Sequence, residues 1–201
     1  MSSMSRYPLL PTPAPAAARE NDPLEERTTS EEVIFDGKFV RLVRDEVDIP
    51  GGRKSQRLFL RHGGAACMVA LGEDGTILLE RQWRHPLARS FWELPAGKID
   101  PGEEMIDCAR RELMEECGVA ASRWTELGII NNAIGYSTEL IVIYLAEGLT
   151  EETQRLDEGE NLEVYRVTLD EAVRMATDGR ITDVKTICGI FWARERLARR
   201  G

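Results

Sequence analysis

Residues 93–119, ELPAGKIDPGEEMIDCARRELMEECGV, are the stretch from which the fold can be worked out. Two prolines and two glycines near its start predict an irregular loop. Asp100 followed by Pro101 is the pattern of a helix N-cap followed by a first-turn proline. We therefore expect a helix over residues 101–117, ended by Gly118.

The expected helix has two faces of different chemistry. One carries apolar residues at spacings of three and four, typical of a buried stripe: Ile106, Ala109 and Leu113. Glu112 and Glu116 are four residues apart and lie one above the other on a different face. Glu115 completes this acidic cluster, and Arg111 is placed to pair with Glu115.

An acidic helix face is ordinarily just solvated, and like charges at this spacing cost only roughly 0.2–0.5 kcal/mol per pair. Here the neighbouring loop brings Glu103 and backbone carbonyls close to the start of the helix. Hard carboxylate and carbonyl oxygens that converge on one spot suit Mg²⁺, or Mn²⁺ as a substitute. The stretch therefore predicts a divalent-cation site.

The same stretch resembles the Nudix box of the Nudix hydrolases, whose pattern is G-x5-E-x7-R-E-U-x-E-E-x-G-U with U aliphatic. The matching residues are Gly97, Glu103, Arg111, Glu112, Leu113, Glu115, Glu116, Gly118 and Val119. The resemblance implies an α/β (α+β) fold, an α/β/α sandwich with a mixed sheet. It also implies hydrolysis, with Mg²⁺, of a nucleoside diphosphate linked to another group.

Roles for individual residues follow from this resemblance. Glu112, Glu115 and Glu116 are expected to bind the metal through their side chains, with Glu115 also taking part in catalysis. Ala96 is expected to bind the metal through its backbone carbonyl. Glu103 and Arg111 are expected to orient the helix carboxylates without binding the ion themselves.

The flanks of the box narrow the branch of the family. Residues 93–98 and residues 183–186, Asp-Val-Lys-Thr, resemble the ADP-ribose and nucleotide-sugar pyrophosphatases. In that branch the N-terminal strands exchange between subunits, which implies a homodimer with a shared site. The expected reaction is hydrolysis of ADP-ribose to AMP and ribose 5-phosphate.

The loop after the box both matches the branch and departs from it. Gly135, Ser137 and Glu139 match, and we expect Ser137 and Glu139 to contact substrate, Glu139 across the dimer. Ile134 replaces the branch's proline, and Tyr136 lies near the position of a tyrosine in dinucleoside polyphosphate hydrolases. Another nucleotide sugar (GDP-mannose or ADP-glucose), or a dinucleoside polyphosphate, therefore remains an alternative substrate. A sensor that binds ADP-ribose without cleaving it is a further alternative.

Three more residues receive roles from the branch. Arg84 matches an arginine that contacts the diphosphate. Glu158 lies in a glycine-containing acidic loop where branch members carry a mobile loop with the catalytic base, and Glu160 in the same loop is expected to contact metal or water. A general base must first come within hydrogen-bond distance of the proton that it accepts, and its pKa matters only then. The neighbouring glycine gives the loop the flexibility for this approach.

Outside the box, the chain divides into regions of different composition. We expect a flexible Pro/Ala-rich tail over residues 1–30, a β region for dimerisation and substrate contacts over 31–62, and the Nudix domain over 63–201. Strands are expected at residues 33–35, 39–43, 57–60, 65–71, 76–81, 128–131, 140–146 and 162–167. Thr168 and Glu171 form a capping box for another helix, and apolar residues between 187 and 197 predict a last one.

Composition excludes several classes of protein. The formal net charge is −9, which disfavours nucleic acid and anionic membranes as partners. No stretch approaches the roughly 18 apolar residues of a membrane span. The four cysteines form no CxxC pair, which favours free thiols in a reducing cytoplasm over disulfides or a zinc site.

Overall fold

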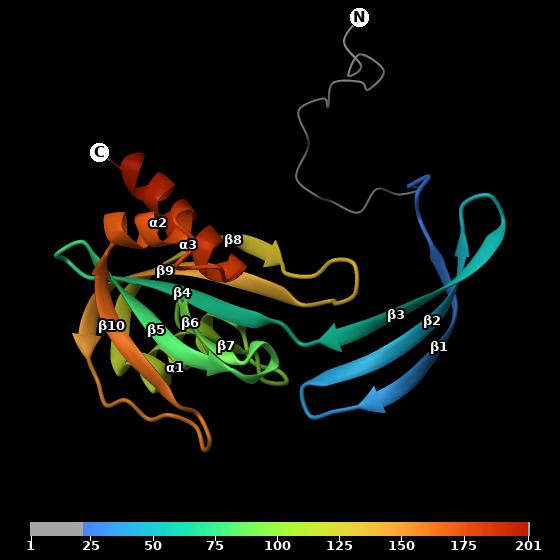
Figure 1. The fold of residues 1–201 in the computed structure, drawn as a ribbon, viewed down its shortest axis with the longest axis horizontal. Helices are drawn as coiled ribbons and strands as arrows, with labels where there is room; N and C mark the ends of the chain where they lie inside the picture. Colours follow the sequence, from blue (N-terminus) through green and yellow to red (C-terminus); the bar gives the residue numbers. More distant parts are fainter. Residues whose placement is uncertain (1–21, 201) are drawn as a thin grey trace, which may run out of the picture.

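The computed structural model describes residues 22–200 (Figure 1). A short 3₁₀ turn, His85–Leu87, lies between the fifth and sixth strands. The elements in chain order are β1 (Arg27–Asp36), β2 (Val40–Ile49), β3 (Arg53–His62), β4 (Ala65–Leu71), β5 (Thr76–Arg84), β6 (Arg89–Glu93), β7 (Ala96–Lys98), α1 (Met105–Cys117), β8 (Val119–Asn131), β9 (Leu140–Glu151), β10 (Leu162–Thr168), α2 (Leu169–Thr177) and α3 (Val184–Ala198).

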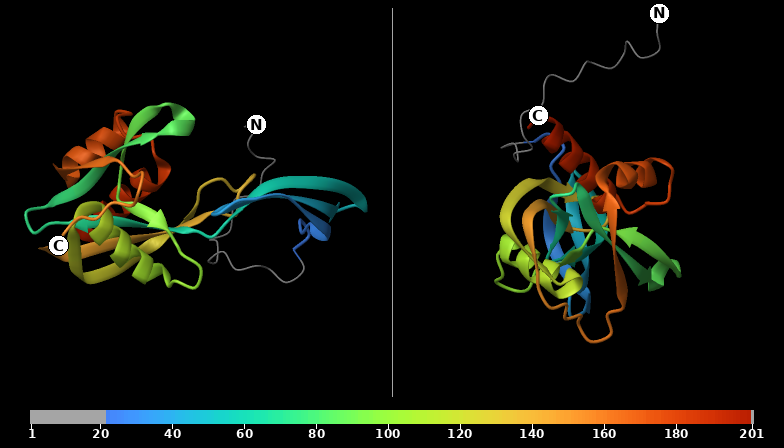
Figure 2. Two further views of the ribbon diagram at one scale, coloured as in Figure 1. Left: turned by 90° about the horizontal axis from the view of Figure 1, so that it is seen from below. Right: turned by 90° about the vertical axis from the view of Figure 1, so that its left-hand side faces the viewer.

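The large sheet lies between two helical layers (Figure 2). Its strands run in the order β10-β5-β4-β9-β8, with β6 paired to β5 and β7 paired to β4. The β4–β9 pair is parallel and the other pairs are antiparallel, so the sheet is mixed. The expected α/β/α sandwich is therefore confirmed.

The two cores follow from side-chain alternation along the central strands. On β4, Cys67 and Val69 pack with α2 and α3 in one core. Their neighbours Ala66 and Met68 face the other way and pack against Leu113 and the rest of the apolar stripe of α1. The sheet is thus buried on both faces, which explains why β4 and β9 read as nearly continuous apolar runs.

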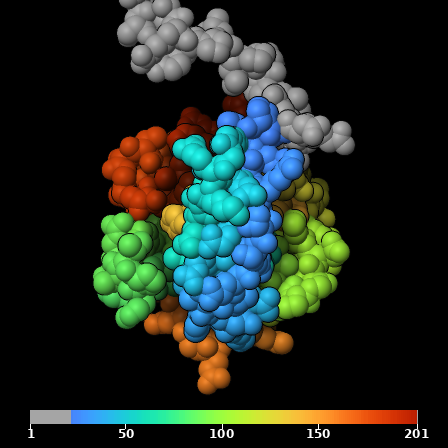
Figure 3. Space-filling model, turned by 90° about the vertical axis from the view of Figure 1, so that its right-hand side faces the viewer, coloured from blue at the N-terminus to red at the C-terminus, as the bar shows by residue number. Residues whose placement is uncertain are grey.

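A separate antiparallel sheet, β1-β2-β3, projects to one side of the sandwich (Figure 1). Gly63 and Gly64 join β3 directly to β4. The amide of Leu60 donates to the carbonyl of Tyr136 (2.8 Å), and the amide of Thr138 donates to the carbonyl of Leu60 (2.9 Å). Figure 3 shows this sheet, blue to cyan, in front of the sandwich. The loop after β8 therefore ties the small sheet to the Nudix box side of the fold.

The structure corrects two expected boundaries. The helix begins at Met105 instead of Pro101, because Gly102 adopts φ +82° and residues 100–103 form a turn closed by the amide of Glu103 on the carbonyl of Asp100. Strand β1 begins at Arg27, so the last residues of the expected tail belong to the small sheet. The rest of that tail, residues 1–21, lies outside the described residues.

The other expected strands and helices are found, most of them longer than expected. Strands β6 and β7 were not expected, since each is only a few residues long; β6 ends where the opening stretch begins, and β7 lies within its loop-like part. Among residues 22–200, no helix is long and apolar enough to cross a membrane.

Candidate active site

The site forms where strand β7 comes into close contact with helix α1. The carboxylate of Glu112 lies directly against Gly97, where a Cβ atom would be 1.8 Å from the Glu112 Cδ. Any side chain at position 97 would displace this carboxylate. Gly118 ends the helix with φ +65°, a conformation that favours glycine, and its amide donates to the carbonyl of Met114.

Arg111 holds three glutamates of the Nudix box at once. Its Nε and Nη2 donate to the two oxygens of Glu103 (2.8 and 2.9 Å). Its Nη1 donates to Glu112 (2.8 Å) and to Glu115 (3.1 Å). These bonds lower the pKa of Glu103 to about 2, because the guanidinium favours the charged carboxylate.

Glu116 lies deeper, at the junction of α1 and the sheet. It is 3% exposed, and its Oε2 accepts a hydrogen bond from the amide of Ala96 (2.9 Å). The amide and carbonyl of one strand residue point to the same side, so the Ala96 carbonyl also points away from β4. Beneath it, Glu80 is 2% exposed and accepts a hydrogen bond from the Cys117 thiol (3.4 Å).

The buried carboxylates of this group repel one another. Burial, followed by the charges of Glu80, Glu112 and Glu160, raises the pKa of Glu116 to about 10. Burial and then the charges of Glu160 and Glu93 raise the pKa of Glu80 to about 7, against the opposing bond from the Cys117 thiol. Burial also raises the pKa of Glu112. The group thus lacks positive charge, which a cation would supply.

The donor set fits a hard divalent ion in its chemistry: carboxylate oxygens and a strand carbonyl, beside a glycine that leaves room for them. Within the described part of the chain, no three acidic, histidine or cysteine side chains already form a metal cage. The reason is that Glu112 and Glu115 are turned to Arg111, and Glu116 to the Ala96 amide. Metal binding would exchange some of these bonds for metal–oxygen bonds.

A second group of buried charges lies across from α1, around the end of β6. Arg84 donates to Glu93 through Nε (2.7 Å) and Nη2 (2.8 Å). Lys185 of α3 donates to the same Glu93 and to Asp183 (3.0 Å). Burial raises the pKa of Glu93, but Arg84 and Lys185 outweigh it, and the net pKa is lowered. In this group every charge has an opposite partner.

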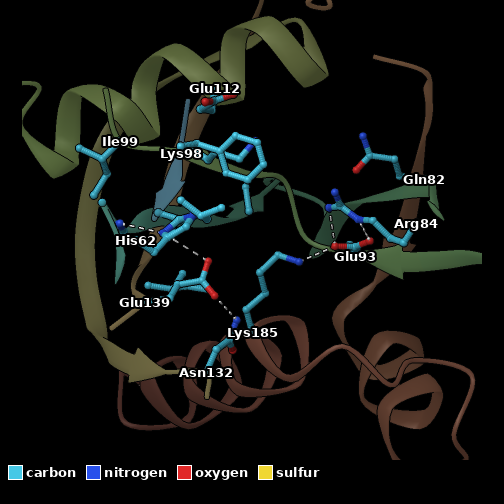
Figure 4. A pocket seen from close by; sticks show the side chains of 18 of the residues that line it. His62, Gln82, Arg84, Glu93, Lys98, Ile99, Glu112, Asn132, Glu139 and Lys185 are labelled. Carbon is cyan, nitrogen blue, oxygen red and sulfur yellow. Dashed lines mark hydrogen bonds and ion pairs between the residues drawn. The ribbon is translucent and has the colours of Figure 1, made fainter. Parts of the chain in front are cut away.

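Both groups open into one cavity of about 1220 Å³ (Figure 4). Its lining includes Glu112 and Glu116 from α1, Arg84 from β5, and Lys185 from α3. The small sheet of the same chain also contributes, through residues 37–41 and through Arg61 and His62. The cavity thus brings the predicted Arg84, Ala96, Gly97, Glu112, Glu116, Glu139 and Glu160 together, with Arg111.

Other predicted residues lie elsewhere. Glu103 and Glu115 do not line the cavity, but both accept hydrogen bonds from Arg111, which does. In the acidic loop, Glu160 lies on the cavity wall within 3.4 Å of Gln82, whereas Glu158 is exposed outside it. Ser137 also lies outside, and its hydroxyl accepts a bond from the Glu139 amide (3.1 Å).

Three residues of the site had no expected role. Glu80 follows the apolar run Ile77-Leu78-Leu79, and an acid directly after a buried apolar run was the signal available in the sequence. Glu93 and Lys185 both lie in stretches recognised as typical of the branch, but their pairing joins residues 92 positions apart. Sequence spacing alone could not have shown that pair.

The fold and this site define a class: an α/β/α sandwich whose glutamate-rich helix faces a cavity that an arginine and a lysine also line. Residues 61–188 match the NUDIX domain, which is more than half of the chain. The chain belongs to the Nudix family, and it is a Nudix hydrolase.

Two relatives cover most of the chain. The ADP-ribose pyrophosphatase of Bacillus subtilis (strain 168) is 38% identical over 169 residues, covering 83% of this chain and 91% of that protein. The ADP-ribose pyrophosphatase of Mycobacterium tuberculosis is 37% identical over 167 residues, covering 82% and 81%. A crystal structure of an ADP compounds hydrolase superposes with a TM-score of 0.77 at 22% identity, covering 88% of this chain and 96% of that one. The structural likeness supports the fold.

Proposed function

We propose that this protein hydrolyses the diphosphate of ADP-ribose, giving AMP and ribose 5-phosphate, and that it requires Mg²⁺. The observation that carries the proposal is the cavity, in which the Nudix carboxylates of α1 face the Arg84–Glu93–Lys185 group. The ADP-ribose pyrophosphatases that match most of this chain support the same substrate.

In this reaction water attacks one phosphorus, the bond from that phosphorus to the bridging oxygen breaks, and the other phosphate leaves. Glu112, Glu115, Glu116 and the Ala96 carbonyl would hold the ion, which would supply positive charge against the phosphates and lower the pKa of a bound water. Arg84 donates a hydrogen bond to a diphosphate oxygen from the nitrogen that Glu93 leaves free. The 157–160 loop accepts the proton of the attacking water, with Glu160 already on the cavity wall and Glu158 reaching it by loop movement.

The test is turnover of ADP-ribose by the purified protein with Mg²⁺, with products separated by chromatography. We expect equal amounts of AMP and ribose 5-phosphate, and no turnover in EDTA. Mn²⁺ is expected to replace Mg²⁺. Tight binding of ADP-ribose with no products would contradict the proposal and support a sensor.

A second candidate is another nucleotide sugar or a dinucleoside polyphosphate. The observation that favours it is Ile134, which replaces a proline of the branch and is 86% exposed in the loop that is hydrogen-bonded to β3. A panel of ADP-ribose, ADP-glucose, GDP-mannose and diadenosine polyphosphates decides the matter by kcat/KM. A higher kcat/KM for any of the others would replace ADP-ribose as the proposed substrate.

We also propose that the protein acts as a homodimer in the cytoplasm. Apolar side chains of the small sheet are exposed in the single chain, including Val33, Phe35 and Leu58. The four cysteines are free thiols, as a reducing compartment would keep them. Light scattering during size-exclusion chromatography should give twice the 22.6 kDa of one chain, and a monomer would contradict the dimer.

A further inference from the structure

The start of helix α3 makes contacts that the proposed reaction does not require. Asp183 caps the helix, accepting from the Thr186 amide (3.0 Å) and hydroxyl (2.5 Å). The Thr186 hydroxyl in turn accepts from the Leu94 amide (2.8 Å), so it fixes α3 to the chain just after β6. Asp183 also accepts from Lys185 (3.0 Å). The helix start is thus fastened to the residue that follows Glu93.

The Lys185 side chain extends from the start of α3 toward Glu93 (Figure 4). Its side chain is 10% exposed and that of Glu93 is 5% exposed, so water contributes little to holding either group. The ammonium bonds Oε2 of Glu93, the oxygen that also accepts from Nη2 of Arg84. One carboxylate therefore joins a lysine of α3 to an arginine of β5.

The Glu93 carboxylate fixes the orientation of the Arg84 guanidinium. Its Nε and Nη2 are both used on Glu93, while within residues 22–200 its Nη1 has no hydrogen-bond partner. The Arg84 side chain is 42% exposed and lines the cavity. A guanidinium held through two nitrogens keeps its third in a fixed direction, which suits a phosphate oxygen.

Charge balance makes the lysine necessary for this arrangement. Burial lowers the pKa of Lys185, but Asp183 and Glu93 more than offset it, so the amine stays charged. Without that charge, Arg84 would be left, within this group of four side chains, to balance both Glu93 and Asp183, whose charges already act on it. Arg84 would then turn further toward the two carboxylates, or excess negative charge would remain beside the substrate.

We propose that Lys185 is a positioning residue that acts through Glu93 to aim Arg84 at the substrate diphosphate. This inference rests on the proposed function, since it assumes that a diphosphate binds in the cavity. It assigns a role to the Asp183–Thr186 segment that the metal chemistry leaves unexplained.

Two other roles for Lys185 make different predictions. Lys185 lines the cavity itself, so it could contact the substrate directly, independently of Glu93. Alternatively it could serve folding alone, by neutralising buried Glu93 and Asp183. A double-mutant cycle between Lys185 and Glu93 separates all three roles.

The test compares Lys185→Met, Glu93→Gln and the double variant, with KM and kcat for ADP-ribose and Tm measured for each. Lys185→Met should raise KM by about 10- to 100-fold, the range for a lost charge-assisted hydrogen bond, with kcat changed less. Glu93→Gln should raise KM similarly, and Lys185→Met added to it should change KM by less than about threefold. Lys54→Met, at a side chain 80% exposed on the small sheet, controls for the loss of one positive charge and should leave KM unchanged.

If Lys185→Met raises KM as much in the Glu93→Gln background as it does in the wild type, Lys185 contacts the substrate directly and the proposal is overturned. A drop in Tm with unchanged KM would overturn it in favour of a folding role. If Lys185→Met alone does not fold, Glu93→Gln and the charge-balanced double variant still give the comparison: equal KM values support the proposal and unequal values refute it. If wild-type protein does not cleave ADP-ribose, the proposed function fails. The same cycle is then measured by calorimetry with ADP. The affinity for ADP should fall in those variants for which a higher KM was expected.

Discussion

The two charged walls of the cavity differ in how their buried charges are balanced. On the α1 wall, Glu112 and Glu116 lie near Glu80 and Glu160, and burial, followed by mutual repulsion, raises the pKa of Glu116 and of Glu80. On the opposite wall, Arg84, Glu93, Lys185 and Asp183 pair with one another in alternating sign. The first wall has a surplus of carboxyl groups over basic groups, and the second is balanced within itself.

This difference indicates what each wall contributes. A buried group with surplus charge gains the most from a bound counter-ion, so the α1 wall is suited to recruiting a cation. A balanced group changes little when a ligand arrives and can hold a donor in a fixed direction. Substitutions should therefore affect metal-dependent turnover on one wall and substrate affinity on the other.

The largest effect is expected from Glu116→Gln. The substitution keeps the size of the side chain and its bond from the Ala96 amide, but a glutamine cannot take up the negative charge with which Glu116 would bind a cation. Turnover of ADP-ribose should fall by about 10³-fold or more, comparable to losing a preorganised electrostatic group. The measurement is kcat with saturating Mg²⁺.

Glu104→Gln is the matched control, since Glu104 is an exposed glutamate next to the start of the same helix. It should keep wild-type kcat. Unchanged turnover in Glu116→Gln would remove Glu116 from the metal site and with it the proposed contrast between the walls.

The next effect concerns the acidic loop, residues 157–160, whose Glu160 lies near Glu112 and Glu116. Glu160 lines the cavity and Glu158 does not, so we expect Glu160→Gln to lower kcat by about 10²-fold, within the range for loss of a general base. Glu158→Gln should lower it much less if the loop stays as it is here. The reverse order would show that the loop moves during catalysis and that Glu158 is the base.

A smaller effect is expected from Gly97→Ala. The added Cβ would overlap the Glu112 carboxylate and push it from the α1 wall, lowering kcat by about 10-fold and destabilising the fold by about 1–3 kcal/mol. Gly135→Ala, where a Cβ meets nothing within 4 Å, should leave stability unchanged. Thermal unfolding and kcat of both variants check this, and wild-type kcat in Gly97→Ala would show that Glu112 can move freely.

How far the sequence predicted the molecule also differs between the two walls. The two α1 residues of the first wall come from one contiguous stretch, in which helical spacing places Glu112 and Glu116 on one face, so this part of the wall could be predicted. The first turn of that helix was misplaced because Asp100 and Pro101 are as typical of a turn as of a helix start. Only the structure shows Gly102 at positive φ and Glu103 turned back to Arg111.

The opposite wall could not be predicted in the same way. Its members come from β5, β6 and the start of α3, and the Glu93–Lys185 pair depends on how α3 packs on the sheet. Residues 93–98 and 183–186 were recognised as typical of the branch, yet nothing in their local pattern shows that they meet. A tertiary contact between two charged residues has no period in the sequence.

The smallest effect concerns stability alone, and it isolates the surplus charge of the α1 wall. Burial and repulsion raise the pKa of Glu80 to about 7 and of Glu116 to about 10, above the value of 4.5 for an ordinary glutamate. In the folded state these groups therefore hold protons that the unfolded chain has already released. Their contribution to the free energy of unfolding is full below pH 4.5 and is lost as pH rises toward 7 and then 10.

In EDTA, Tm should therefore fall between pH 6 and pH 9, by about 2–4 °C for each kcal/mol lost. Glu116→Gln should flatten this fall, because the glutamine carries no proton to lose, and saturating Mg²⁺ should offset it in the wild type by binding the deprotonated carboxylates. Lys54→Met offers the contrasting case, since Lys54 is exposed on the small sheet and does not line the cavity, so this variant should keep the wild-type dependence on pH. An equal pH dependence in wild type and Glu116→Gln would mean that the surplus charge of the α1 wall is relieved within the protein, without any ion.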